Sequence, residues 1–113
     1  MKDLHAAVQR LIGDIETVVA AADSQGLPLK KHHRQTFELQ LQSLRVVDSE
    51  LHERVVTRRV WSLGEATIPV VRAMLRAAGR PKVGVPSALV DQAQASNMHL
   101  RQELHRFAEG RAK

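Results

Sequence analysis

The sequence contains no cysteine, very few aromatic residues and no long apolar run. The lack of cysteine excludes disulfides, a thiolate nucleophile and cysteine-ligated zinc. Aromatic residues make up 3% of the chain, as Phe37, Trp61 and Phe107, whereas β-sheets draw on aromatic and β-branched residues. No apolar stretch approaches the roughly 20 residues that span a bilayer, and the first residues lack the apolar core of a signal peptide. We therefore expect a cytoplasmic protein, and the chain shows no strand signal.

The residues that are present favour helices packed through aliphatic side chains. Leu, Ala, Val and Gln dominate a chain of 113 residues, of which 43% are hydrophobic and 26% charged. This composition, and a length near the most common domain size, predict a single helical domain over residues 1–113. We expect an all-α fold, a helical bundle of about four helices that contains an antiparallel helical hairpin and assembles into an oligomer.

Two long helices are predicted in the N-terminal half. The apolar residues within 4–22 recur in alternating steps of four and three, the spacing of one buried helix face. We expect this helix over residues 3–26, since Gly26 and Pro28 favour its end. A similar stripe predicts a second helix over residues 35–62, and the short connector makes the two helices an antiparallel hairpin.

The C-terminal half is predicted to hold two further helices. Proline suits the first turn of a helix and damages an interior, so we place a break or kink between Ser62 and Pro69. The third helix is then expected over residues 67–79. Residues 80–86 contain two prolines and form the clearest linker, and the last helix is expected over residues 87–108.

The last helix carries a heptad pattern with a polar residue in its seam. An amide at such a position costs stability but specifies register and strand number in coiled coils. The seam is therefore predicted to be a dimer or partner interface, formed by Val90, Ala93, Asn97, Leu100, Leu104 and Phe107. The alternative is that Asn97 lies at the edge of an intramolecular bundle.

Basic residues form a second candidate surface. The chain has a formal net charge of +5, and arginine suits phosphate or carboxylate because its planar fork donates two parallel hydrogen bonds. The basic stripe predicted to meet a partner or DNA comprises Arg58, Arg59, Arg72, Arg76, Arg80 and Lys82. A solvated face that keeps the protein soluble is the alternative.

Residues 70–94 resemble a helix-turn-helix only weakly. The connector over residues 80–86 is longer than the usual turn of about three to four residues. The last helix also offers few side chains for reading bases, namely Ser87, Gln92 and Gln94. Duplex DNA is therefore the second choice of partner, after a protein.

Metal and catalytic sites are not expected. The i,i+4 pairs Asp48–His52 and His99–Glu103 could each face an ion, but the Glu-x-x-His signature of di-iron bundles does not occur. A nucleophile elbow, a phosphate loop and a dinucleotide fingerprint are missing as well. We expect no catalytic residue, no cofactor, no metal and no small-molecule substrate.

These patterns predict a small non-enzymatic regulatory or adaptor protein that forms a homodimer and binds a protein partner through a helical face. The alternative is a DNA-binding accessory protein or transcriptional regulator that uses the basic residues. No membrane partner is expected.

Overall fold

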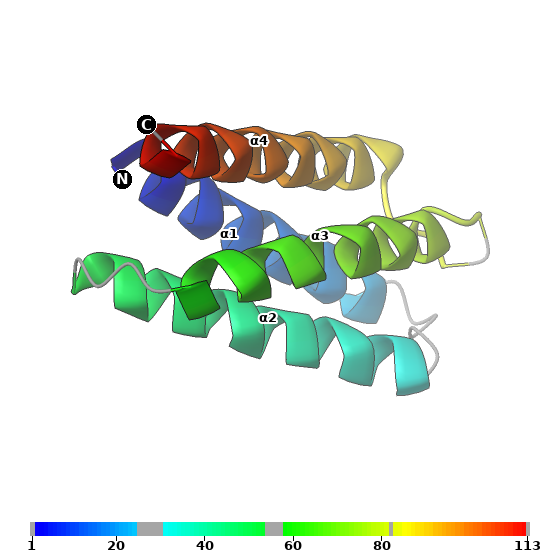
Figure 1. Cartoon of the computed structure of the whole chain (residues 1–113). Coiled ribbons are helices and arrows are strands. Elements are labelled where there is room, and N and C mark those ends of the chain that lie inside the picture. The colour runs from blue at the N-terminus through cyan, green and yellow to red at the C-terminus, as the bar shows by residue number, and fades with distance from the viewer. Residues whose placement is uncertain (1, 25–30, 54–57, 82, 113) are drawn as a thin grey trace.

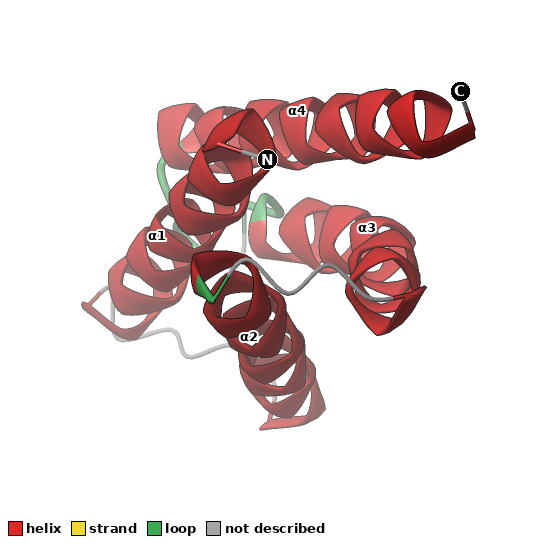
Figure 2. Cartoon of the chain, turned by 60° about the vertical axis from the view of Figure 1, so that its left-hand side comes forward, coloured by secondary structure: helices red, strands yellow, loops and turns green. Residues whose placement is uncertain are grey.

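A computed structural model describes residues 2–24, 31–53, 58–81 and 83–112. Within them it contains four α-helices: α1 (Lys2–Ser24), α2 (Lys31–His52), α3 (Arg58–Ala78) and α4 (Ser87–Ala112). Helices that follow one another in sequence pack together, and α1 also packs against α4, so the four form a ring of antiparallel neighbours (Figure 1 and Figure 2). The predicted all-α bundle and its N-terminal antiparallel hairpin are thereby confirmed.

One apolar core runs along a bundle that measures 48 × 21 × 18 Å. α1 buries the whole stripe predicted for the first helix, namely Leu4, Val8, Leu11, Ile15, Val18 and Ala22. The partly exposed Ile12 and Val19 pack at the edge of this core. A face of this width exceeds a two-position coiled-coil seam, and it lets α1 contact both α2 and α4.

The boundary between α2 and α3 differs from the sequence-based prediction. The second helix was predicted over residues 35–62, whereas α2 begins at Lys31 and ends at His52. The third helix was predicted over residues 67–79, whereas α3 begins at Arg58 and ends at Ala78. Of the expected break or kink ahead of Pro69, the break is therefore wrong, because residues 58–68 belong to the same helix as Pro69.

α3 continues through Pro69 because its apolar face continues on both sides of the proline. Val60, Thr67 and Val71 are all buried, while Pro69 lies on the exposed side. Burying an apolar side chain contributes about 1.5–3 kcal/mol, and an interior proline costs about 3 kcal/mol. Several buried side chains on one face therefore outweigh one proline on the other.

The remaining helix ends lie close to their predicted places. α1 runs to Ser24, and the rest of the helix predicted up to residue 26 lies outside the described residues. α4 begins at Ser87 as predicted, but it continues to Ala112, since alanine and arginine propagate a helix past residue 108. The predicted linker is non-helical wherever it is described, and Gly84 in it has a φ of 75°, a left-handed conformation that favours glycine.

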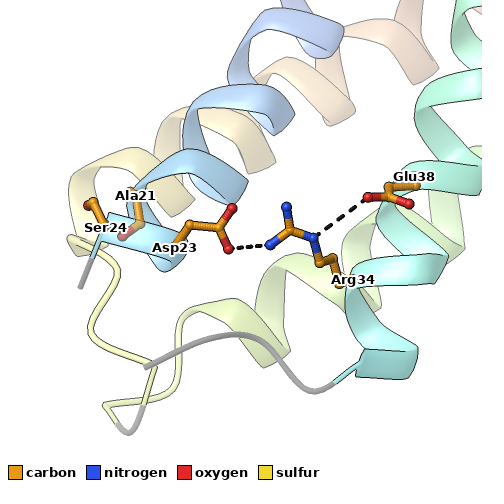
Figure 3. Close-up of polar contacts among 5 residues, drawn as sticks. All are labelled: Ala21, Asp23, Ser24, Arg34 and Glu38. Atoms are coloured by element: carbon orange, nitrogen blue, oxygen red, sulfur yellow. Dashed lines mark hydrogen bonds and ion pairs between the residues drawn. The ribbon is translucent and has the colours of Figure 1, made fainter. Parts of the chain in front are cut away.

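Surface ion pairs join the end of α1 to the start of α2. Figure 3 shows the Arg34 side chain between Asp23 on α1 and Glu38 one turn further along α2. Arg34 Nη1 donates to Asp23 Oδ1, and Arg34 Nε lies 3.6 Å from Glu38 Oε1. The pKa of Arg34 is raised, mainly by the hydrogen bond to Asp23 and then by the negative charges of Asp23 and Glu38. Arg45 and Glu16 form a second pair across the hairpin at 3.4 Å, so complementary charges support its register.

Candidate functional site: the groove between α3 and α4

The seam that was predicted as a dimer or partner interface packs inside the chain. Five of its six side chains are buried, namely Val90, Ala93, Asn97, Leu100 and Leu104, and Phe107 is partly buried. α4 lies against α1 and α3, which cover this face. The buried residues therefore present no surface to a second chain, and the seam is an intramolecular one.

Asn97 joins α4 to α3. Its side chain is 1% exposed, and its Nδ2 donates to the backbone carbonyl of Ile68 at 3.1 Å. Its Oδ1 is buried and has no hydrogen-bond partner among the described residues. The amide thus specifies how α3 and α4 align within one chain. The alternative reading placed Asn97 at the edge of an intramolecular bundle, whereas the structure places it in the interior of that bundle.

The predicted basic stripe is exposed but divided. Arg58, Arg59, Arg72, Arg76 and Arg80 are all exposed, and Lys82 lies outside the described residues. Arg59 Nη1 lies 3.8 Å from Glu50 Oε1 of α2, and Arg80 follows the end of α3. Arg72 and Arg76 line one hollow, whose lining does not include Arg58, Arg59 or Arg80. The stripe is therefore not one continuous surface.

An open hollow of about 520 Å³ lies between α3 and α4. It is lined by Glu65, Ile68, Pro69, Arg72, Ala73, Arg76, Met98 and Arg101. Among the residues that the structure describes, Arg72, Arg76 and Arg101 make no ion pair. Met98 is 41% exposed beside them. Three arginines and an exposed apolar residue therefore line one hollow.

A second hollow, of about 380 Å³, lies toward the start of α3 and the end of α4. Arg58, Trp61, Phe107 and Ala108 line it, and Trp61 is 37% exposed. On the side of the first hollow that faces the second, Glu65 Oε1 of α3 lies 3.6 Å from His105 Nε2 of α4. The groove between α3 and α4 thus has an arginine-rich end, a central acid–histidine pair and an aromatic end.

Sequence reasoning missed Trp61, Met98 and Arg101 of the groove, and the Glu65–His105 pair as well. Arg101 lies four residues after Asn97 and three after Met98, so Asn97, Met98 and Arg101 lie along the same side of α4, at the flank of the buried seam. That spacing was visible in the sequence. The sequence did not show which neighbouring helix this flank contacts, because periodicity indicates that a face is buried but not which element covers it.

The side chains proposed to read bases are already engaged within the chain. Gln92 Nε2 donates to Asp14 Oδ1 of α1 at 3.1 Å, and Gln94 Nε2 donates to the backbone carbonyl of Arg72 at 3.2 Å. Only Ser87, at the start of α4, stays exposed without such a bond among the described residues. Base reading by this helix would therefore break bonds that align α4 with α1 and α3.

Of the two pairs considered as metal ligands, only His99 and Glu103 lie close together among the contacts of the described residues, whereas Asp48 lies against His5 instead of His52. His5 Nε2 lies 2.7 Å from Asp48 Oδ1, and the ring of His52 stands edge-on to His5 at 6.0 Å between centroids. His99 Nε2 lies 3.5 Å from Glu103 Oε1. Within the described ranges no three such side chains converge as a metal site would require.

Comparison with known proteins gives no match: no protein-family model, no curated protein and no solved structure is similar to this chain. No helix in the described part of the chain is long and apolar enough to cross a membrane. The functional proposal below accordingly rests on the groove between α3 and α4.

Proposed function

We propose that this protein is a small non-enzymatic regulatory or adaptor protein that binds a partner protein in the groove between α3 and α4. The observation that carries the proposal is the group of three arginines, Arg72, Arg76 and Arg101, that make no ion pair with any described residue and lie beside the exposed Met98. Protein interfaces are enriched in arginine, methionine and aromatic residues at their centre. A partner carboxylate would supply the ion pairs that these guanidinium groups lack within the described chain.

A protein is favoured over duplex DNA by the acidic residue in the groove. Glu65 lines it together with the arginines, and a carboxylate repels the phosphate backbone that supplies most non-specific DNA affinity. Gln92 and Gln94 are engaged in bonds within the chain. DNA stays the second candidate because Arg58, Arg72 and Arg76 are exposed along one helix.

Charge reversal in the groove tests the proposal. The double variant Arg72→Glu/Arg76→Glu should lose the partner that the wild-type protein captures from an extract of its own cell. The control Arg10→Glu/Lys31→Glu carries the same change of charge on exposed positions of α1 and α2, and it should retain that partner. Because these side chains are exposed, both variants should keep the wild-type circular dichroism spectrum.

A salt series separates the two candidates. If a protein is the partner, random and native-promoter duplexes should bind no tighter than about 10 µM at physiological salt, the usual level of non-specific association. Submicromolar binding to a duplex at about 150 mM salt, lost in Arg72→Glu/Arg76→Glu and weakening steeply with added salt, would establish the DNA-binding function instead. Equal partner capture by wild type and groove variant would refute the groove as the binding surface.

A further inference from the structure

We propose that the groove accepts an acidic amphipathic helix of the partner, with its carboxylates at the arginine end and an apolar side chain at the Trp61 end. This inference rests on the proposed function and specifies the chemistry of the partner. The arrangement of side chains along the groove carries it.

Two stripes of side chains line the groove at helical spacing. The α3 stripe consists of Arg58, Trp61, Glu65, Pro69, Arg72 and Arg76, each three or four residues after the one before. The facing α4 stripe consists of Met98, Arg101, His105 and Ala108. Ridges of this spacing on two packed helices leave a groove that accepts the ridge of a third helix. The α3 stripe rises about 27 Å, which matches a helix of about five turns.

A helix suits this groove better than an extended peptide. α3 and α4 bond their backbone N–H and C=O groups within each helix, so they offer no sheet edge to which a strand could add. Binding must come from side chains, and a helical partner satisfies its own backbone while it presents one face. An amphipathic helix is therefore the expected occupant.

The side chains that line the groove differ between its two ends, and this difference predicts which residues the partner helix carries at each end. Arg72 and Arg76 lie one turn apart on α3, in the hollow that Arg101 of α4 also lines, so they match two carboxylates that are also one turn apart. Trp61 precedes Arg72 by 11 residues, which is three turns, or about 16 Å, along the same face. The partner helix should accordingly carry an apolar side chain about three turns from its acidic pair.

The centre of the groove disfavours a uniform polyanion. Glu65 lines the arginine-rich hollow on its side toward Trp61, and its Oε1 lies 3.6 Å from His105 Nε2. Met98, which lines the same hollow, is 41% exposed. A nucleic acid would place phosphates along the whole groove, including against Glu65. A peptide with charge at one end and an apolar residue at the other avoids this repulsion.

Designed peptides test the pattern directly. The matched probe is a helix of about 20 residues, built mainly of alanine and glutamine, with two glutamates one turn apart and a leucine three turns away on the same face. The mismatched probe has the same composition with its leucine on the opposite face. The full chain is titrated with each labelled probe by fluorescence anisotropy, and emission of Trp61, the single tryptophan, reports on the aromatic end.

The matched probe should bind at least about tenfold more tightly than the mismatched one, a ratio equivalent to about 1.4 kcal/mol. Only the matched probe should shift Trp61 emission to the blue, because it covers the indole with apolar surface. Arg72→Glu/Arg76→Glu should weaken the matched probe about tenfold or more, whereas Arg10→Glu/Lys31→Glu should leave its affinity unchanged.

Three results would overturn the inference. Equal affinity for the two probes would refute the proposed spacing of charged and apolar residues on the partner. Binding without a change in Trp61 emission would refute contact of the partner with the aromatic end of the groove. A doubled mass in light scattering that Arg72→Glu/Arg76→Glu abolishes would show that a second copy of the chain occupies the groove. The partner helix would then not be its occupant. In the first two cases a partner captured through Arg72 and Arg76 would leave the proposed function standing, so the two failures are distinguishable.

Discussion

Replacing Gly64 of α3 by alanine, with Gly13 of α1 as the control position, tests how closely α3 and α4 approach. Gly13 lies exposed in α1, and a Cβ added there meets no atom within 4 Å. Gly64 lies buried in α3, where an added Cβ would sit 3.0 Å from Leu104 Cδ1 and 3.1 Å from Leu104 Cδ2. Both substitutions relieve the same helix-propensity cost of glycine, about 0.5–1 kcal/mol. Only the second one crowds a neighbouring helix.

The contact with Leu104 decides whether Gly64→Ala raises or lowers the free energy of unfolding. Leu104 is fully buried, so its methyl groups have little room to yield, and overpacking a core costs about 1–3 kcal/mol. We expect Gly13→Ala to stabilise the protein by up to about 1 kcal/mol and Gly64→Ala to destabilise it by about 1 kcal/mol. In a chain of this size each change moves Tm by roughly 4 °C.

A double-mutant cycle isolates the contact. Leu104→Ala alone should cost about 2–5 kcal/mol because it leaves a cavity. In that background Gly64→Ala should become stabilising, which gives a coupling energy of about 2 kcal/mol. Urea unfolding followed by far-UV circular dichroism measures each variant at constant m. The reasoning is refuted if Gly64→Ala stabilises the wild-type chain as much as Gly13→Ala does, or if the cycle shows no coupling to Leu104.

Three further substitutions test single positions by urea unfolding. Asn97→Leu should raise stability by about 1 kcal/mol, because it removes a buried oxygen without a partner at the cost of one hydrogen bond; a change of mass in light scattering would contradict the intramolecular seam. Pro69→Ala should raise stability by about 1–3 kcal/mol, because it restores an N–H in the middle of α3, and a loss of stability would show that the proline ring is needed there. Gly84→Ala should lower stability by about 1 kcal/mol, because alanine is strained at a positive φ; an unchanged midpoint would speak against that conformation.

The sequence alone determined the local features of this protein. The spacing of apolar residues in 4–22 predicted the helix and the face that α1 buries, because a period near 3.6 residues places them on one side whatever they pack against. The linker with two prolines placed the start of α4 at Ser87, because proline and glycine interrupt helices through local sterics. The exposed positions of Arg72 and Arg76 also followed from their spacing opposite the apolar face.

Only the tertiary structure decided which elements meet. Pro69 lies inside α3 because burial of Val60 and Val71 on the opposite face outweighs a local cost, and that burial exists only once α2 and α4 are in place. The seam around Asn97 meets α3 of the same chain at Ile68, although its heptad pattern fits a second chain equally well. Arg101 lines the same hollow as Arg72 and Arg76 because α3 and α4 pack together. The pattern of one helix is visible in its sequence, but packing across the bundle determines which neighbouring helix completes a site.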